Sequence, residues 1–183
     1  MSPAGVEDDR VDPPISTERV YEGEIVHLRV SEYRRASGLV VRREVIDHPG
    51  AVVIVPVEHE TVLMVRQPRE AVQERLLELP AGKKDRPGED PLQCAQRELA
   101  EEVSREADTW RDLGGFYTAP AILTEFIDCF MATDLRPSAV EPLPDEEIEV
   151  VPWPLADLPA LIGRVHDAKT VIGLLRLARE LGV

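Results

Sequence analysis

Three glutamates within a span of five residues are the feature of this sequence with the clearest chemical potential. Glu98, Glu101 and Glu102 belong to the run Arg97-Glu98-Leu99-Ala100-Glu101-Glu102. If the run is helical, residues three and four apart are neighbours, so the three carboxylates share one face. Crowded like charges are unfavourable unless a cation lies among them, and hard divalent ions such as Mg²⁺ prefer carboxylate oxygens. The spacing therefore indicates a metal site, with a solvated acidic helix face as the alternative.

The residues around these glutamates predict the helix that must carry them. Asp90 can act as the N-cap, Pro91 suits the first helical position, and Gln93 stands where a capping-box partner belongs. An apolar stripe at helical spacing can face a core, formed by Leu92, Ala95, Leu99 and Val103. Before the helix, a predicted strand over residues 76–80 leads into a loop that contains Gly82. Strand, glycine loop and acid-faced helix together favour the metal site over the solvated face.

The segment from Gly82 to Arg105 resembles the Nudix box. In family terms this box is glycine, five residues, glutamate, seven residues and R-E-U-x-E-E-x-G-U, where U is a bulky aliphatic residue. The matching positions are Gly82, Glu89, Arg97, Glu98, Leu99, Glu101 and Glu102. Three features depart from the pattern: six residues separate Gly82 from Glu89, Ser104 replaces the family glycine, and Arg105 takes the last aliphatic place. None of them removes a metal ligand, and Ser104 stands where glycine would ease a left-handed turn.

The resemblance extends over roughly residues 17 to 180 and points to the ADP-ribose pyrophosphatase branch of the family. Its further marks are the segment from Val40 to Val52, Val65-Arg-Gln-Pro-Arg, Leu79-Pro-Ala-Gly, and Pro120, fifteen residues beyond the box. The resemblance implies that a metal-activated water attacks the pyrophosphate of ADP-ribose, which gives AMP and ribose 5-phosphate. Another nucleoside diphosphate sugar or a dinucleotide is the alternative substrate. A non-catalytic ligand-sensing module is the alternative of a different class, and the retained glutamates argue against it.

The resemblance also assigns roles around the metal. Glu98, Glu102 and the backbone carbonyl of Ala81 are expected to bind Mg²⁺, with Mn²⁺ as the other candidate, and Glu101 is a further ligand or a shared site. Arg97 is expected to orient the carboxylates. Glu125, on the loop after Pro120, corresponds to the general base of the family. A box glutamate is the alternative base. In the other interpretation, Glu125 is an exposed loop carboxylate without a catalytic role.

Five residues are candidates for substrate binding. Arg43 and Glu44 match family positions that contact the adenosine half of the substrate across a dimer interface, and Arg69 matches a phosphate-contacting arginine. Arg66 is a further candidate for the pyrophosphate because an acidic chain needs well-placed arginines to meet an anion. Ile25 lies near a position where some relatives carry a stacking aromatic residue, and it could contact adenine. For the arginines, a surface ion pair is the alternative.

Composition limits the class of protein and its partners. The chain has 183 residues, enough for one compact enzyme domain. Its formal net charge of −14 makes a nucleic-acid polymer an unfavourable partner. No apolar run reaches the length of a membrane span and the first residues lack the layout of a signal peptide, so we expect a soluble cytoplasmic protein without a membrane partner. The two cysteines, Cys94 and Cys129, are too few for a disulfide framework or a zinc site.

The order of predicted elements indicates an α/β protein. Apolar alternation predicts strands over about residues 19–33, 39–47, 51–57, 61–65, 114–117, 126–133 and 147–153. Two closing helices are expected over about residues 155–164 and 168–181, the second with an apolar face of Val171, Leu174, Leu175 and Leu177. The resemblance implies a Nudix-type α/β/α sandwich with an additional N-terminal antiparallel sheet. We therefore expect a loose arm at 1–17, a dimerisation hairpin or sheet at 18–48, a catalytic domain at 49–183, and a homodimer with shared active sites.

Overall fold

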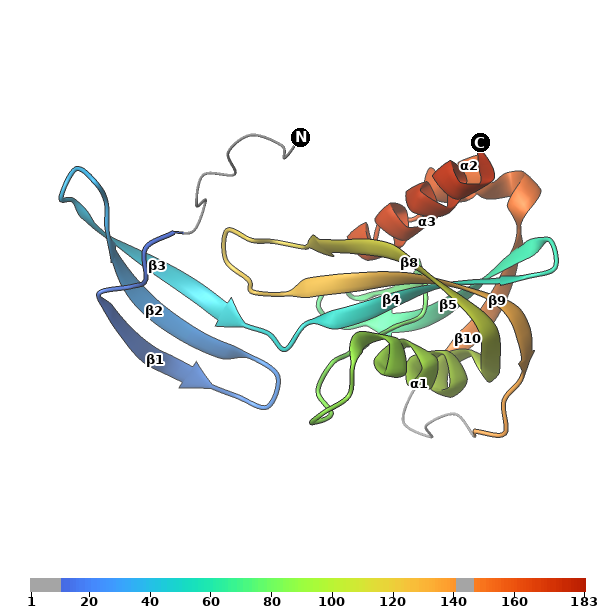
Figure 1. The fold of residues 1–183 in the computed structure, drawn as a ribbon, viewed down its shortest axis with the longest axis horizontal. Helices are drawn as coiled ribbons and strands as arrows, with labels where there is room; N and C mark the ends of the chain where they lie inside the picture. Colours follow the sequence, from blue (N-terminus) through green and yellow to red (C-terminus); the bar gives the residue numbers. More distant parts are fainter. Residues whose placement is uncertain (1–10, 141–146) are drawn as a thin grey trace, which may run out of the picture. The chain divides into compact units, whose positions relative to one another are not determined.

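The chain forms two compact units in the computed structural model, which describes residues 11–140 and 147–183. The N-terminal unit comprises Met1–His48 and Ala119–Thr124, and the C-terminal unit comprises Pro49–Thr118 and Glu125–Val183. Figure 1 shows a small sheet in the first unit and strands covered by helices in the second. Most of the arm expected at 1–17 lies outside the described residues, and the first strand begins inside that range, at Ser16.

The N-terminal unit is a three-stranded antiparallel sheet in the order β1-β2-β3. The strands are β1 (Ser16–Glu22), β2 (His27–Arg34) and β3 (Val40–Asp47). The single strand expected over residues 19–33 is therefore wrong. A turn divides it, in which the N–H of Gly23 donates to the carbonyl of Val26 at 2.9 Å.

Residues 119–124 belong to the N-terminal unit although they connect two strands of the other unit along the chain. The N–H of Ile46 on β3 donates to the carbonyl of Ile122 at 2.8 Å, and the N–H of Thr124 donates to the carbonyl of Ile46 at 3.1 Å. The backbone N–H of His48 also donates to Thr124 Oγ1 at 2.8 Å. These bonds attach the segment that precedes Glu125 to the edge of β3.

The C-terminal unit contains a seven-stranded sheet with helices on both faces. Its main order is β10-β5-β4-β9-β8, while β6 pairs with β5 and β7 pairs with β4. The strands are β4 (Ala51–Glu58), β5 (Thr61–Arg69), β6 (Glu74–Glu78), β7 (Ala81–Lys83), β8 (Arg105–Tyr117), β9 (Phe126–Pro137) and β10 (Glu149–Pro154). The helices are α1 (Pro91–Val103), the 3₁₀ turn η1 (Leu155–Asp157), α2 (Leu158–Ile162) and α3 (Ala168–Leu181). This arrangement confirms the predicted Nudix-type α/β/α sandwich.

Strand β4 separates the two halves of the core because its side chains alternate between the faces of the sheet. Val53 and Val55 are fully buried in the cluster that includes residues of α2 and α3. Val52 and Ile54 are fully buried in the cluster that includes residues of α1. Strand β4 pairs in parallel with β9, and a parallel strand covered on both faces reads as a continuous apolar run.

Two expectations about the apolar pattern differ from the structure. Leu175 was expected on the buried face of α3, but 52% of it is exposed, whereas Leu174 and Leu177 are fully buried. A strand was expected only at 114–117, but β8 begins at Arg105, directly after Ser104 ends α1. The first part of β8 was not predicted because it carries many charged, exposed residues. Such a pattern is typical of a solvated edge strand, and β8 lies at the edge of the sheet.

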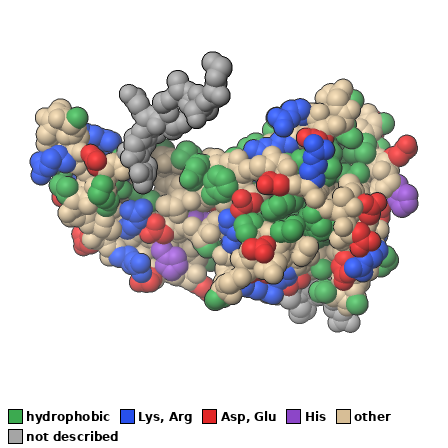
Figure 2. Space-filling model, viewed as in Figure 1, with side chains coloured by type: hydrophobic (Ala, Val, Ile, Leu, Met, Phe, Trp, Pro, Cys, Tyr) green, Lys and Arg blue, Asp and Glu red, His purple; other side chains and the backbone are tan. Residues whose placement is uncertain are grey.

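The face drawn in Figure 2 has acidic and basic side chains interspersed over its described residues. Across residues 11–140 and 147–183, no helix is long and apolar enough to cross a membrane.

Candidate active site

Helix α1 positions the glutamates because its first turn is fixed by a complete capping box. The side chain of Asp90 accepts from the backbone N–H of Gln93 at 2.9 Å, and the side chain of Gln93 accepts from the N–H of Asp90 at 3.0 Å. Ala95 and Leu99 are fully buried and fix the rotation of the helix against the sheet. Ser104 ends the helix in the left-handed region, with φ of 54°, so the predicted turn forms without a glycine.

Arg97 is the centre of the acidic cluster. Its Nε and Nη2 donate to the two oxygens of Glu89 at 2.9 and 3.0 Å. Its Nη1 donates to Glu101 Oε2 at 2.9 Å and also to Glu98 Oε1. The hydrogen bonds that Arg97 donates to Glu89 and then to Glu101 raise the pKa of Arg97 above its ordinary value. One guanidinium thus contacts three carboxylates at once, and the orienting role of Arg97 stays a prediction.

The short strand β7 brings backbone close to the same carboxylates. The N–H of Ala81 donates to Glu102 Oε2 at 3.1 Å, and Glu102 is only 8% exposed. A Cβ atom at Gly82 would lie 1.8 Å from Cδ of Glu98. Any side chain at position 82 would therefore displace Glu98, which explains why glycine is needed here. The backbone of strand β7 therefore lies directly against the carboxylates of helix α1.

The donors of this cluster have the chemistry that a hard divalent cation requires. Glu98, Glu101, Glu102 and Ala81 all line one cavity, and carboxylate and backbone carbonyl oxygens are the usual ligands of Mg²⁺. Within the part of the chain that the structure describes, no three acidic, His or Cys side chains already surround a common point as a metal site. Arg97 contacts two of the three glutamates, so a bound cation would share these carboxylates with the guanidinium.

Glu125 lines the same cavity and directly precedes β9. The hydroxyl of Thr118, at the end of β8, donates to Glu125 Oε2 at 2.7 Å. The structure therefore brings the candidate base together with the box glutamates. The sequence interpretation missed Thr118, although a hydroxyl residue directly before the loop of a candidate base is a signal that could have identified it.

A second charged cluster is built around Glu78, which is 1% exposed. Arg69 donates to both of its oxygens, from Nε to Oε1 and from Nη2 to Oε2, at 2.7 Å each. Lys169 Nζ also donates to Oε2. Burial acts to raise the pKa of Glu78, but the hydrogen bond from Arg69 and the charge of Lys169 outweigh it, so the pKa lies below its ordinary value.

The start of helix α3 completes this second cluster. Asp167 is the N-cap, and its Oδ2 accepts from the N–H and hydroxyl of Thr170 at 3.0 and 2.6 Å. The same oxygen accepts from Lys169 Nζ at 2.9 Å. The buried hydroxyl of Thr170 in turn accepts from the N–H of Leu79 at 2.9 Å. These bonds join the end of β6 to the first turn of α3 and fix where Lys169 lies.

The two clusters line one cavity of about 790 Å³. Its charged lining includes Arg97, Glu98, Glu101, Glu102 and Glu125, together with Arg69, Asp167 and Lys169. Sequence reasoning did not identify Glu78, Asp167 or Lys169. Two signals could have indicated Glu78 and Asp167: Glu78 is an acid inside the apolar run Leu-Leu-Glu-Leu-Pro, and Asp167 precedes a helix as its cap.

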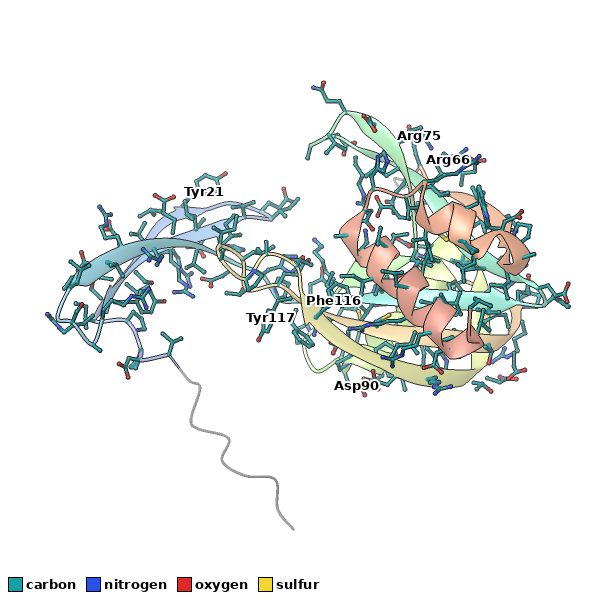
Figure 3. The ribbon with its side chains drawn as sticks, turned by 90° about the horizontal axis from the view of Figure 1, so that it is seen from above. Tyr21, Arg66, Arg75, Asp90, Phe116 and Tyr117 are labelled. Atoms are coloured by element: carbon teal, nitrogen blue, oxygen red, sulfur yellow. The ribbon has the colours of Figure 1, made fainter. Side chains whose placement is uncertain are left out.

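Arg66 is not among the residues that line this cavity. Side chains of a strand alternate between faces, and Gln67 and Arg69 are the residues of β5 that line it. Arg66 instead pairs with Glu149 on β10 at 3.5 Å. Figure 3 marks Arg66 and also Arg75, which comes from the paired strand β6 and whose Nη1 donates to Glu147 Oε2 at 3.0 Å. The ion-pair alternative describes Arg66 here, and its substrate role remains a prediction without support from the cavity.

The other substrate candidates belong to the N-terminal unit. Arg43 and Glu44 lie on β3, where Arg43 Nη1 donates to the carbonyl of Arg42 at 2.7 Å. Both line a pocket of about 350 Å³ within that unit. Ile25 lies in the turn between β1 and β2 and is 67% exposed. Their contact with substrate remains a prediction.

Cys94 and Cys129 are both free and buried. Burial raises the pKa of Cys94 to about 12 and that of Cys129 to about 11. A thiol with so high a pKa is a poor nucleophile near neutral pH. Neither thiol is therefore suited to act as a nucleophile near neutral pH.

Comparisons with known proteins show the family of the chain. The chain is 33% identical over 165 residues to the methanol dehydrogenase activator of Bacillus methanolicus, a match that covers 87% of this chain and 89% of that protein. It is 37% identical over 166 residues to the ADP-ribose pyrophosphatase of Mycobacterium tuberculosis (strain ATCC 25618 / H37Rv), covering 88% and 80%. A crystal structure of an ADP compounds hydrolase shares the fold, with a TM-score of 0.84 at 24% identity over 94% of this chain and 96% of that one. The sequence pattern of the NUDIX domain matches residues 47–172, and the chain belongs to the Nudix family.

Proposed function

We propose that this protein hydrolyses the pyrophosphate of ADP-ribose to AMP and ribose 5-phosphate, in a reaction that depends on a divalent metal ion. One observation carries the proposal: a single cavity of about 790 Å³ is lined by clustered carboxylates and by paired cations. Carboxylates attract a metal ion, and cations attract a pyrophosphate. The name of the Mycobacterium tuberculosis relative, ADP-ribose pyrophosphatase, supports the choice of substrate.

Glu98, Glu102 and the carbonyl of Ala81 would hold Mg²⁺, or Mn²⁺, with Glu101 as a further ligand. When bound, such an ion stabilises charge on phosphoryl oxygens and lowers the pKa of a coordinated water. Arg97 keeps the carboxylates at fixed positions through its bonds to Glu98 and Glu101. This role resembles that of the outer residues that orient metal ligands in other sites.

Glu125 would accept the proton of the attacking water. It lines the cavity, and the bond from Thr118 restrains one of its oxygens. A restrained carboxylate beside the reacting phosphorus is suited to general base catalysis. Glu101 is the alternative base, since it lines the same cavity.

Binding of the substrate would be shared with a partner subunit. Arg69 would contact a phosphate from within the cavity that it lines. Arg43 and Glu44 of a partner subunit would contact the adenosine half, and Ile25 would provide an apolar contact to adenine. The exposed position of Ile25 supports this assignment because its side chain is accessible to a ligand.

A homodimer is proposed because the N-terminal sheet has almost no core of its own. Ser31 is the one buried residue among the described residues of that unit. Strand β1 is exposed along its whole length, and exposed apolar side chains include Val20, Tyr21, Leu39 and Val40, of which Tyr21 is marked in Figure 3. A small sheet needs a further apolar surface for stability in water, and a second copy would supply it. Sedimentation that finds an active monomer would contradict this proposal.

The test of the proposed function is a substrate panel with identified products. Purified protein would be incubated with ADP-ribose, GDP-mannose, NADH and diadenosine polyphosphates, with Mg²⁺ and separately with EDTA. We expect AMP and ribose 5-phosphate from ADP-ribose, and no turnover in EDTA. Faster cleavage of GDP-mannose or a dinucleotide would favour the alternative substrates, which share the pyrophosphate. Absence of turnover on the whole panel would favour a ligand-sensing module. The panel does not test the predicted location in the cytoplasm, which stays a separate prediction.

A further inference from the structure

We propose that Lys169 binds a phosphate of the substrate beside Arg69, and that Glu78 is the positioning residue that keeps the two cations together. This inference rests on the proposed function, because it concerns the same cavity. The match to the family box covers neither Lys169 nor Glu78, and the two residues are 91 positions apart in the sequence.

The first argument is that the two cations lie side by side. Arg69 Nη2 and Lys169 Nζ both donate to the same oxygen, Oε2 of Glu78. Two positive groups repel each other at such a separation unless a carboxylate lies between them. Glu78 provides that carboxylate, and Asp167 provides a second one through its bond to Lys169.

The second argument concerns the donors that remain. A guanidinium has five N–H donors, and Arg69 uses Nε and part of Nη2 on Glu78. An ammonium has three donors, and Lys169 uses two of them on Glu78 and Asp167. Counting bonds within the described residues, each cation therefore keeps N–H donors for a ligand. Both side chains line the cavity, and that of Arg69 is 40% exposed.

The third argument is that the cations are already in place before a ligand binds. Thr170 connects Asp167 to the backbone of Leu79, so the start of α3 cannot shift without breaking buried hydrogen bonds. Restraint of this kind reduces the entropy that a long lysine side chain loses on binding. A prearranged pair of cations suits a pyrophosphate, which presents several anionic oxygens close together.

The test compares Lys169→Met with a matched control, Lys84→Met. Lys84 also pairs with an acidic residue, with Nζ 2.6 Å from Asp128 Oδ2, and it is not among the cavity-lining residues. The readouts are the KM for ADP-ribose with Mg²⁺ and the Kd of inorganic pyrophosphate by calorimetry in the same buffer. We expect Lys169→Met to raise both by about 10- to 100-fold, the effect of losing a hydrogen bond to a charged group. Lys84→Met should leave both unchanged, and Lys169→Arg should recover most of the affinity.

Three results would overturn the inference: unchanged KM and Kd in a folded Lys169→Met protein, equal losses in Lys84→Met, or no pyrophosphate binding by the parent protein. If Lys169→Met fails to fold, Lys169→Gln keeps a donor for Glu78 and serves in its place. If Lys169→Met unfolds at a lower temperature but binds pyrophosphate with normal affinity, Lys169 has only a structural role, and this result also contradicts the inference. Weakened pyrophosphate binding in a protein that never cleaves ADP-ribose would support the inference while the proposed function fails.

Discussion

The two charged clusters of the cavity are both built from ion pairs, but one has a cation at its centre and the other has a carboxylate. Arg97 is one cation that contacts three carboxylates, whereas Glu78 is one carboxylate that contacts two cations. The first arrangement leaves negative charge in excess, which a metal ion can neutralise. The second leaves N–H donors in excess, which an anion can accept. The sign of the central group thus determines which part of a metal-bound pyrophosphate each cluster attracts.

This difference separates the expected kinetic effects of the two clusters. Loss of a carboxylate that serves the metal or the attacking water should lower kcat, because that interaction strengthens in the transition state. Loss of a cation that holds a phosphate throughout should mainly raise KM. Variants of the acidic and basic residues can therefore be sorted by which constant changes.

The largest expected effect is that of Glu125→Gln. If Glu125 accepts the proton of the attacking water, kcat should fall by roughly 10²- to 10⁴-fold, with little change in KM for ADP-ribose. Steady-state kinetics with Mg²⁺ would measure this, with Glu147→Gln as control because Glu147 pairs with Arg75 and is not among the cavity-lining residues. Constants within a few-fold of the parent would leave Glu125 a simple loop acid. A raised KM at normal kcat would make it a substrate contact.

Glu102→Gln follows, with an expected loss of at least ~100-fold in metal-dependent activity. The change removes one charge from a largely buried cluster with almost no change in volume, so the fold should persist. Circular dichroism would check the fold, and a Mg²⁺ titration would measure the metal-dependent activity. Glu106→Gln is the control, because Glu106 pairs with Arg136 on the neighbouring strand and is not among the residues that line the active-site cavity. Near-normal rates in Glu102→Gln would contradict its assignment as a ligand.

The third effect is on stability and depends on pH. Glu78→Gln should lower the free energy of unfolding by about 2 kcal/mol at neutral pH, because it weakens hydrogen bonds to two charged partners. The pKa of Glu78 is lowered in the folded state by Arg69 and Lys169 against the effect of burial, with Asp167 as the other charged neighbour. Its contribution is therefore complete above the ordinary carboxyl pKa of about 4.3 and is lost as pH falls through the lowered value. Urea unfolding from pH 7 to pH 3 should show the two proteins converging, and a constant difference would contradict this account.

The acidic cluster could be predicted from the sequence because its geometry is local. The capping box at Asp90 and Gln93 and the buried stripe through Leu99 determine how α1 lies, and the glutamates follow from helical spacing. The need for glycine at position 82 can also be predicted, since the box places Gly82 where the backbone approaches the side chain of Glu98 closely. The same local reasoning identified β4 and β5, whose apolar runs flank the turn at His59.

Arg69 was a candidate from the sequence, but the basic cluster as a whole could not be predicted because its contacts form only when distant segments meet. Glu78 ends a short strand, Arg69 comes from the strand paired with it, and Lys169 comes from the first turn of α3. Nothing in local periodicity states that a helix 91 residues later will contact Glu78. The exposure of Leu175 has a similar origin, because the packing of α3 on the sheet decides which apolar residues are covered.

The smallest expected effect is that of Arg69→Lys, and it tests whether the basic cluster needs more than charge. An ammonium cannot reproduce the two parallel bonds that Arg69 makes to Glu78, so the new side chain would be held less firmly and would offer fewer donors. We expect KM for ADP-ribose to rise about tenfold, near 1.4 kcal/mol, with kcat almost unchanged. Arg66→Lys is the matched control, because Arg66 lies on the same strand and pairs with Glu149 instead. Equal KM changes in both variants would restore Arg66 as a substrate contact, whereas no change in Arg69→Lys would show that any cation at position 69 is sufficient.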